Sequence, residues 1–531
     1  MSAGHRLILS GLLAALLLAT FFPPIGIMAP AEIPSEPLPP DVKLETVIPS
    51  AKYLVAMDFT PDGRLLYTER ISDFVGGTYR GFVRVVVNGQ LRPEPVYAFP
   101  VLHEGERGLL GIAVDPDFAV NHYVWVYFSR YSEQLDCGSN YKNRVVRFVL
   151  NNDNTLAGEP ETMGCFPIGR YETIHNGGNL HFGPDGRLYI TVGNNDARND
   201  GADPAQNLGS PLGKLHRFNG AGPLSVPADN PFPGSSIYAY GLRNSFDFDF
   251  DPITGQIFAT ENGDACDDEV NRLLPGGNYG WRPNYPCDDG APGGPDPLYN
   301  TIPPVIYWPA SIAPTGITFY RGDLIPEWKN DLFMCAFKDG ATALHHFKLN
   351  ATRTAIVAHT IIAGTQCRTD VLTGPDGALY YSEGGGYYHG PIKRLVRRTS
   401  FAATSVAALP MNPPSGGSVD YTIALRHSGA LSNTFALTVT LPAGPAWIIG
   451  AQAEQGSLTQ LSYQVQWSGT VTNAVAWTAT YRLQISTVPT TAYPLTHAVR
   501  LTAPGATTVI LTPTVMVNGA LTSLPLIWRG Y

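Results

Sequence analysis

A histidine in a glycine-rich segment is the first residue that could carry out chemistry. His175 lies within residues 173–182 (TIHNGGNLHF), where two glycines let other groups approach the backbone closely. With an ordinary pKa of about 6.5 its ring is largely neutral at neutral pH, so it could accept a proton as a general base. A single histidine more often has a structural role, and His181, in the strand predicted to follow, fits that second interpretation better.

Two later segments are rich in side-chain oxygen atoms. Residues 193–203 (GNNDARNDGAD) include Asn194 and Asn199, and such a loop could bind calcium, hydrogen-bond a sugar or simply form turns. Residues 260–271 (TENGDACDDEVN) hold five acidic residues in nine positions, with no basic residue before Arg272. Carboxylates this dense need a cation or hydrogen bonds to offset their repulsion. Oxygen ligands favour Ca²⁺, although the spacing is not that of an EF-hand.

Two further segments carry basic residues that stand out in the sequence. Arg243 and Asn244 place a guanidinium beside a carboxamide just before a predicted strand. The planar guanidinium could hold an anionic or quinoid oxygen, or it could form a surface ion pair. Lys338 is an isolated lysine within residues 334–340, where it could simply pack between structural units. These groups are scattered along the chain, so the fold must bring them together.

A degenerate repeat predicts how they are positioned. The segment at 59–67 (FTPDGRLLY) recurs at 182–190 (FGPDGRLYI) and 373–381 (TGPDGALYY), with weaker copies at 115–118 and 251–255. Six units of about 60 residues, each with short strands and an Asp-Gly turn, are typical of a six-bladed β-propeller. We expect this propeller over residues 49–398. Loops from several blades of a propeller meet at one face, where scattered residues can form one site.

Residues 399–531 differ from the propeller in composition. Between Ser400 and the C-terminus only six residues are charged, against a background of Thr, Ser, Ala, Val and Leu. Alternating apolar and polar stretches bounded by Gly, Pro and Asn predict about seven strands in an immunoglobulin-like β-sandwich. The chain as a whole is therefore expected to be all-β. Without clustered titratable groups, this β-sandwich is expected to act in spacing, adhesion or attachment to a cell surface.

The N-terminus predicts export. His5 and Arg6 precede an apolar run from Leu7 to Phe22, and the small residues near Ala31 suit a signal peptidase, so residues 1–31 are a predicted signal peptide and residues 32–48 a Pro-rich linker. An uncleaved anchor is the alternative, but a run of about 16 apolar residues is short for a bilayer. We expect a secreted, periplasmic or cell-surface protein with no membrane span in the mature chain.

Charge and cysteine content agree with this location. With 44 acidic and 35 basic residues the net charge is −9, which disfavours nucleic acid as a partner. The six cysteines form an even set that an exported protein would normally pair. Among the fifteen possible connectivities, proximity in the sequence favours Cys137 with Cys165, Cys266 with Cys287 and Cys335 with Cys367.

Taken together, these segments resemble the soluble quinoprotein sugar dehydrogenases of the glucose/sorbosone dehydrogenase family, which use pyrroloquinoline quinone. The resemblance runs from about Pro49 to Arg394 in the family's order. It is carried by residues 105–111 (GERGLLG), the His175 segment, residues 206–215 (QNLGSPLGKL), the Arg243–Asn244 pair, the Asp268–Glu269 loop, residues 276–281 (GGNYGW) and residues 308–316. Each motif alone is weak, but their joint order is specific.

The resemblance implies a reaction and two cofactors. His175 would take the proton of a sugar's anomeric hydroxyl while hydride passes to the quinone, giving a lactone, and an external acceptor would then take the electrons. The quinone would be held by Arg243, Asn244, Lys338, Arg368 and Asn199. Main-chain oxygens of Gly263 and Asp264 match the site of the Ca²⁺ that acts as Lewis acid, and Glu269 with the carbonyl of Tyr279 matches a second calcium site. Glu106 would lie near the substrate.

Three departures from the family pattern leave other functions open. Asn194 stands where the family has an aspartate that supports the catalytic histidine, and Asp196 could substitute for it. Glu106 stands where glutamine is common. Arg368 is a single survivor of a pair of arginines that hold the cofactor's carboxylates. The alternatives are a non-catalytic propeller that binds glycan or protein, as in the Hedgehog-interacting type, and a calcium-dependent lactonase.

Overall fold

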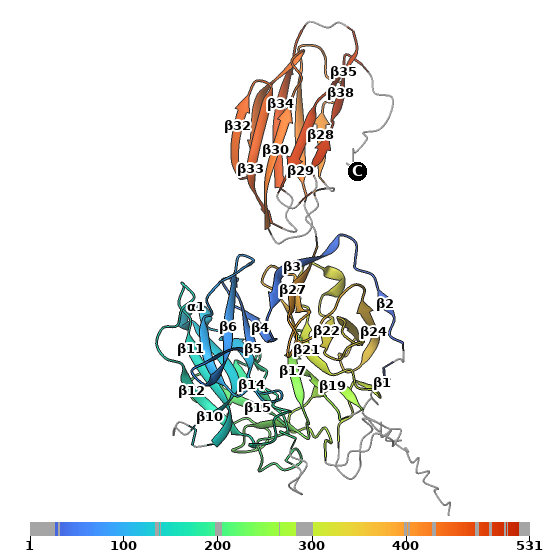
Figure 1. The fold of residues 1–531 in the computed structure, drawn as a ribbon. Helices are drawn as coiled ribbons and strands as arrows, with labels where there is room; N and C mark the ends of the chain where they lie inside the picture. The colour runs from blue at the N-terminus through green and yellow to red at the C-terminus, as the bar shows by residue number, and fades with distance from the viewer. Residues whose placement is uncertain are drawn as a thin grey trace, which may run out of the picture.

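The computed structural model describes residues 27–29, 32–132, 137–138, 140–196, 204–264, 266–282, 301–397, 401, 404–426, 432–472, 477–487, 491–503, 506 and 508–519. The regular secondary structure of these residues is almost entirely β-strand, and the strands are arranged as a propeller and a β-sandwich (Figure 1). The helical elements described are one turn of α-helix, α1 (Phe118–Asn121), and a 3₁₀ turn, η1 (Pro326–Trp328). The fold class predicted from the sequence is confirmed.

Six sheets in the described residues form the blades. The strands of each blade are given in order from the central channel outward. Blade 1 holds β4 (Leu54–Phe59), β5 (Leu65–Val75), β6 (Thr78–Val87), β7 (Gln90–Leu91) and β8 (Tyr97–Val101). Blade 2 holds β9 (Leu109–Val114), β10 (Tyr123–Ser132), β11 (Asn140–Val149) and β12 (Glu161–Pro167). Blade 3 holds β13 (Leu180–Phe182), β14 (Arg187–Val192), β15 (Lys214–Asn219) and β16 (Ile237–Tyr240).

Blades 4 to 6 complete the ring. Blade 4 holds β17 (Ser245–Phe250), β18 (Ile257–Glu261), β19 (Asp268–Leu273) and β20 (Ile306–Trp308). Blade 5 holds β21 (Pro314–Phe319), β22 (Leu332–Ala336), β23 (His345–Leu349) and β24 (Ile356–Ile362). Blade 6 holds β25 (Val371–Thr373), β26 (Leu379–Ser382), β27 (Gly390–Arg397) and, from the N-terminal side, β3 (Val42–Ala51).

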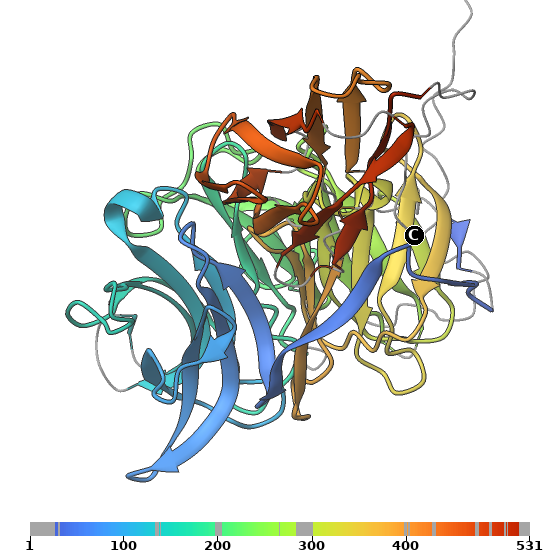
Figure 2. The same ribbon diagram turned by 90° about the horizontal axis from the view of Figure 1, so that it is seen from above.

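The N-terminal segment closes the ring. Strand β3 pairs antiparallel with β27, and in Figure 2 it lies in blue beside the last propeller strands. Before it, β1 (Ile27–Met28) adds to the outer edge of blade 4 and β2 (Ser35–Glu36) to that of blade 5. The range predicted as a linker, 32–48, therefore contains β2 and most of β3, because the sixth blade takes its outermost strand from the N-terminal side. Of the predicted signal peptide, residues 1–26, 30 and 31 lie outside the described residues, whereas residues 27–29 are described and include β1.

Disulfides connect neighbouring parts of the propeller. Cys137 is bonded to Cys165 and Cys335 to Cys367, as proximity in the sequence predicted. Cys266 is also disulfide-bonded, and Cys287, its predicted partner, lies outside the described residues.

Aspartates along the central channel link one blade to the next. Oδ2 of Asp370 accepts the N–H of Met57 at 2.5 Å, which joins blade 6 to blade 1. Oδ2 of Asp58 accepts the N–H of Val114 at 2.7 Å, and Oδ2 of Asp247 accepts that of Ile317 at 2.9 Å. Each bond satisfies an innermost-strand donor that its own sheet leaves unpaired, so these carboxylates help to close the ring.

The channel also holds an ion pair that should make stability depend on pH. Nε2 of His181 lies 2.8 Å from Oδ1 of Asp247. Burial alone would lower the pKa of His181, but Asp247, helped by Asp249 and Asp58, outweighs it and raises this pKa to about 9. A histidine with a raised pKa stabilises the fold fully below its unfolded pKa of about 6.5, and this contribution is lost as the pH rises through the folded value.

We therefore expect the free energy of unfolding to fall between about pH 6.5 and 9, with at most about 3 kcal/mol of this loss due to His181. Urea unfolding followed by circular dichroism at several pH values measures the slope. The His181→Gln variant should flatten it. His216→Gln is the matched control, because burial lowers the pKa of His216 to about 4 and it does not titrate in this window. Equal slopes in wild type and His181→Gln would contradict the assignment.

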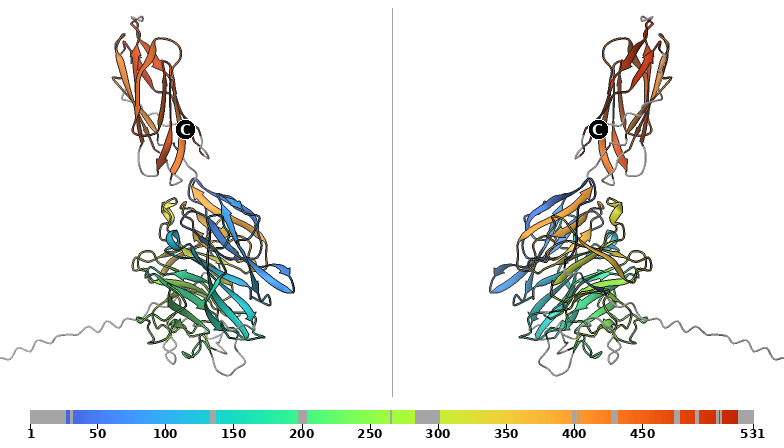
Figure 3. Two further views of the ribbon diagram at one scale, coloured as in Figure 1. Left: turned by 90° about the vertical axis from the view of Figure 1, so that its left-hand side faces the viewer. Right: turned by 90° about the vertical axis from the view of Figure 1, so that its right-hand side faces the viewer.

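The β-sandwich has more strands than predicted. One sheet contains β28 (Ser405–Leu409), β29 (Ser418–Leu425), β34 (Trp477–Ile485) and β31 (Ala446–Ala453). The other contains β32 (Ser457–Leu461), β33 (Gln464–Thr472), β30 (Ser432–Thr440), β36 (Ala498–Thr502) and β37 (Val509–Leu511), and β35 (Tyr493–Thr496) pairs with β38 (Thr514–Val517). Trp467, Trp477 and Tyr481 pack between the sheets. Figure 3 shows the β-sandwich next to the propeller.

Among the helices that the structure describes, none has the length and apolar character needed to cross a membrane.

Candidate active site

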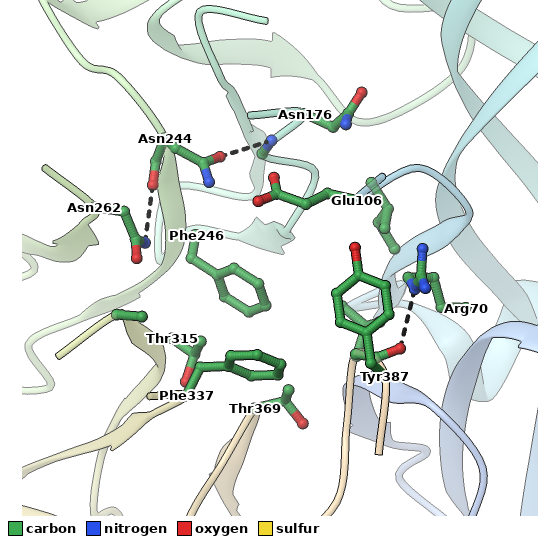
Figure 4. A pocket seen from close by; sticks show the side chains of 15 residues that line it. Arg70, Glu106, Asn176, Asn244, Phe246, Asn262, Thr315, Phe337, Thr369 and Tyr387 are labelled. Carbon is green, nitrogen blue, oxygen red and sulfur yellow. Dashed lines mark hydrogen bonds between the residues drawn. The ribbon is translucent and has the colours of Figure 1, made fainter. Parts of the chain in front are cut away.

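A cavity opens at one end of the central channel. It has about 710 Å³ of empty space, its open mouth included, and the inner strands and loops of several blades line it (Figure 4). Phe246, Phe337 and Tyr387 supply aromatic surface, and the polar lining includes Arg70, Glu106, Asn176, Asn244, Asn262, Thr315 and Thr369. Val55 of β4 lines this cavity, whereas Asp58 lies toward the other end of the same strand, so the cavity occupies one end of the channel only.

His175 lies beside this cavity in the loop before β13. Its backbone is left-handed (φ 55°) and its side chain is buried. The backbone N–H of His175 donates to Oε2 of Glu106 at 2.7 Å. The next residues, Asn176 and Gly177, line the cavity itself. Gly177 also has a positive φ of 59°, and a Cβ there would lie only 2.8 Å from the backbone nitrogen of Gly193. Glycine is thus needed for this loop to pack against the end of β14.

The hydrogen bonds of Asn194 determine which ring nitrogen of His175 is basic. Nδ1 of His175 lies 2.9 Å from Oδ1 of Asn194. The same oxygen accepts the N–H of Asp196 at 3.0 Å, which fixes the amide with its oxygen toward the ring. Because a carbonyl oxygen only accepts, the proton is assigned to Nδ1 and Nε2 becomes the proton acceptor.

Glu106 presents a carboxylate to the cavity beside His175. Burial raises its pKa, while the His175 N–H and the nearby charges of Arg243 and Arg70 lower it, and burial is the larger effect. The side chain can therefore accept hydrogen bonds from hydroxyl groups when ionised and donate one when protonated. Its predicted place near a substrate stays a prediction, but Glu106 lines the cavity as that prediction requires.

Arg70 and Tyr387 form a wall of the cavity that sequence reasoning missed. Arg70 Nη1 donates to the carbonyls of Gly105 and Arg107 at 2.7 and 2.8 Å, and Nε donates to Gly386 O at 3.1 Å. Its guanidinium lies over the Tyr387 ring, 4.4 Å from the centroid. Tyr387 in turn donates its hydroxyl to Gly105 O at 2.6 Å. The glycine-rich run at 384–386 was the one available sequence signal.

Arg243 and Asn244 are held in place by a buried carboxylate. Oε1 of Glu261 accepts both of their backbone N–H groups, at 3.0 and 2.6 Å. Asn244 lines the cavity and Oδ1 of its side chain accepts the N–H of Gly177 at 3.3 Å. The guanidinium of Arg243 donates to Asn262 O at 3.0 Å, next to the cavity, and to Oδ1 of Asp264 at 3.3 Å. The structure thus brings this pair to the same end of the channel as His175.

A second, smaller cavity collects the predicted calcium residues. Gly263, Asp264, Glu269 and Tyr279 all line it, together with Glu261. Burial raises the pKa of Glu261 and of Glu269 to about 8 each. Among the described residues no hydrogen-bond partner reaches the buried Oε2 of Glu261. Within the same residues, no three His, Cys, Asp or Glu side chains form a preformed metal cluster. The oxygen-rich lining and the orphaned Glu261 oxygen nevertheless fit a hard cation that also uses main-chain carbonyls.

Two predicted cofactor residues are not among those that line the cavity, and a third is not described. Lys338 is exposed and does not line the cavity. Arg368 donates to Phe337 O at 2.8 Å and to Oδ1 of Asp339 at 2.9 Å, and it lies over the Tyr388 ring; it is not among the residues that line the cavity. Asn199 lies outside the described residues.

Comparison with known proteins agrees with this architecture. The family described as Glucose / Sorbosone dehydrogenase matches residues 51–387. The aldose sugar dehydrogenase YliI of Escherichia coli is 29% identical over 354 residues, covering 64% of this chain and 90% of that protein. An uncharacterized protein of Synechocystis is 32% identical over 375 residues, covering 64% and 84%.

A solved structure of the aldose sugar dehydrogenase of Streptomyces coelicolor, in its PQQ-bound form, matches with a TM-score of 0.52 and 28% identity, over 67% of this chain and 99% of that one. With the family match extending over more than half of its length, the chain belongs to the glucose/sorbosone dehydrogenase family.

Proposed function

We propose that this protein is an exported quinoprotein dehydrogenase that oxidises the anomeric hydroxyl of an aldose to a lactone. The observation that carries the proposal is the position of His175, whose Nδ1 is hydrogen-bonded to Oδ1 of Asn194 at 2.9 Å, beside the cavity at the end of the channel. That bond makes Nε2 a proton acceptor, and a base is what removal of hydride from a hydroxyl-bearing carbon requires. The oxidation of sugars by other members of the family supports the reaction class.

The residues around the cavity would each have a different role in the reaction. His175 would take the proton from the anomeric hydroxyl, and Glu106 would accept hydrogen bonds from other sugar hydroxyls and so orient the ring. Phe246, Phe337 and Tyr387 exclude water from the reacting atoms. The wall formed by Arg70 and Tyr387 is cross-linked to the Gly105 carbonyl, which keeps Glu106 in register with His175.

Pyrroloquinoline quinone, when bound, would supply the two-electron acceptor for the hydride. The PQQ-bound structure of the Streptomyces relative supports this choice. In this chain Asn244 and the guanidinium of Arg243 would hold its quinone oxygens, because both lie at the His175 end of the channel and both backbones are fixed by Glu261. Lys338 and Arg368 would have to turn inward to reach the cofactor's carboxylates.

Calcium would bind in the smaller cavity, next to Arg243. Main-chain oxygens of Gly263 and Asp264, the carboxylate of Glu269 and the carbonyl of Tyr279 would supply the ligands. A cation there would also offset the repulsion between the buried carboxylates. Electrons would leave to an external acceptor. The β-sandwich would attach the enzyme to a surface, and export would follow from the N-terminal signal.

The test is a titration of metal-stripped protein with pyrroloquinoline quinone and Ca²⁺, followed by dye reduction with a panel of aldoses. We expect turnover only when both are present. Quinone binding without turnover on any sugar would contradict the substrate class. No quinone binding at all would contradict the proposed enzymatic function and favour a propeller that only binds glycan or protein. This second candidate is supported by the absence of Lys338 and Arg368 from the cavity lining.

A further inference from the structure

A carboxylate lies near His175 at a position that the family pattern does not predict. Oδ1 of Asp196 is 3.8 Å from Nδ1 of His175, while the hydrogen bond of that nitrogen goes to the uncharged amide of Asn194. The backbone N–H of Asp196 donates to the same Asn194 oxygen. Asp196 therefore acts on the imidazole in two ways. Its backbone N–H orients the Asn194 amide that contacts the ring, and its carboxylate places a negative charge near the ring.

The turn that carries Asp196 is fixed on several sides. Asn195 and Asp196 both have left-handed backbones, with φ of 55° and 48°. The N–H of Asn195 donates to His175 O at 3.1 Å, and its side chain accepts the N–H of Gly169 at 2.6 Å and donates to Glu172 O at 3.0 Å. Two successive non-glycine residues with positive φ are costly and persist where the surroundings impose them. The turn thus brings the Asp196 carboxylate back toward the ring.

When His175 takes up a proton, its ring gains a positive charge that the uncharged amide of Asn194 does not balance. The side chain is 4% exposed, so an imidazolium there would lose most of its hydration. An amide oxygen orients the ring but offers only a dipole, whereas a carboxylate within about 4–6 Å favours the charged form of histidine. The Asp196 side chain is 31% exposed, so water reaches this carboxylate beside the buried ring.

We propose that Asp196 is the positioning residue whose charge supports protonated His175, in place of the aspartate that Asn194 replaces. This inference rests on the proposed function. In that reaction Nε2 would take the proton of the anomeric hydroxyl, a bound quinone would supply the acceptor for the hydride of the same carbon, and Asp196 would balance the positive charge left on the ring. Among the described residues, the charged groups that act on this region include Glu106, whose Oε2 accepts the backbone N–H of His175, and Arg243 and Arg70, which act on Glu106.

The test measures the pKa of His175 in protein without cofactor, by NMR of ¹³C-labelled histidine. The His175 signal is assigned as the one missing in His175→Asn. We expect Asp196→Asn to lower this pKa by about one unit, because asparagine tolerates the same backbone but carries no charge. The double variant Asn194→Asp/Asp196→Asn should restore it, since the carboxylate moves to the hydrogen-bonded position. Asp153→Asn, an exposed aspartate elsewhere, is the matched control and should change nothing.

An unchanged pKa in Asp196→Asn, or a lowered pKa that the double variant does not restore, would overturn the inference. In the loaded enzyme the acidic limb of the kcat/KM profile should move in the same direction as the pKa. The two proposals fail separately: if the NMR shifts appear but no aldose is oxidised, Asp196 keeps its relation to His175 and the dehydrogenase proposal is the one that falls.

Discussion

Replacing His175 with asparagine should lower kcat for aldose oxidation by about 10² to 10⁴, the usual contribution of a general base. The loss is expected in kcat rather than in quinone binding, because the proposed cofactor contacts come from Asn244 and Arg243. Asparagine is the informative substitution, since it tolerates the left-handed backbone of residue 175. Stopped-flow reduction of the dye, with quinone binding followed separately, makes the measurement.

His122→Asn is the control for that variant. His122 has the same φ of 55° and precedes β10, at the end of blade 2 away from the cavity. The two substitutions therefore impose the same change of residue type on the same backbone geometry. His122→Asn should retain wild-type turnover. If His175→Asn also kept it, the assignment of His175 as the base would be wrong, and another acceptor would have to be sought, such as Glu106, which lines the cavity.

Calcium should raise the melting temperature of the protein, and Glu269→Gln should remove most of that increase. Ca²⁺ at 100 times its Kd stabilises a folded protein by about 2.7 kcal/mol if it binds only the native state. Glu269 is buried in the smaller cavity, where its Oε2 accepts Asn271 Nδ2 at 2.9 Å. Glutamine keeps the shape and the hydrogen-bonding oxygen but removes the charge, so the loss would report on cation binding. Scanning calorimetry with and without Ca²⁺ measures it.

Glu159→Gln supplies the matched comparison, because Glu159 is an exposed residue to which the same chemical change can be made. Its calcium-induced increase should equal that of wild type. An equal increase in Glu269→Gln would exclude Glu269 as a ligand. A wild-type protein whose melting temperature does not respond to Ca²⁺ would contradict the calcium requirement as a whole.

Much of the fold could be predicted from short segments of sequence. The Pro-Asp-Gly turns at 61–63, 184–186 and 375–377 recur at the same place in blades 1, 3 and 6, between the first and second strands. A turn and the alternation of its flanking strands depend on neighbouring residues, so they are visible without the fold. The sharp fall in charge after residue 400 likewise predicted the separate β-sandwich.

The candidate site was predictable only in part. The order of motifs indicated His175, Asn244 and the acidic loop of residues 260–271, and the structure places all three at one end of the channel. That Lys338 and Arg368 are absent from the cavity lining did not follow from any motif. Arg368 contacts the carboxylate of Asp339 and the rings of Phe337 and Tyr388. The spacing of residues along the chain does not predict that these partners lie within its reach.

The strands, the turns, the repeat and the residue types available for chemistry can therefore be predicted from local sequence. Which side chains meet depends on the folded ring. Asp370 bonds the backbone of Met57, 313 residues earlier, and Tyr387 bonds Gly105, 282 residues earlier. Contacts of this kind exist only once six blades close into a ring, because closure brings the last blade next to the first. No local preference of either residue carries that information.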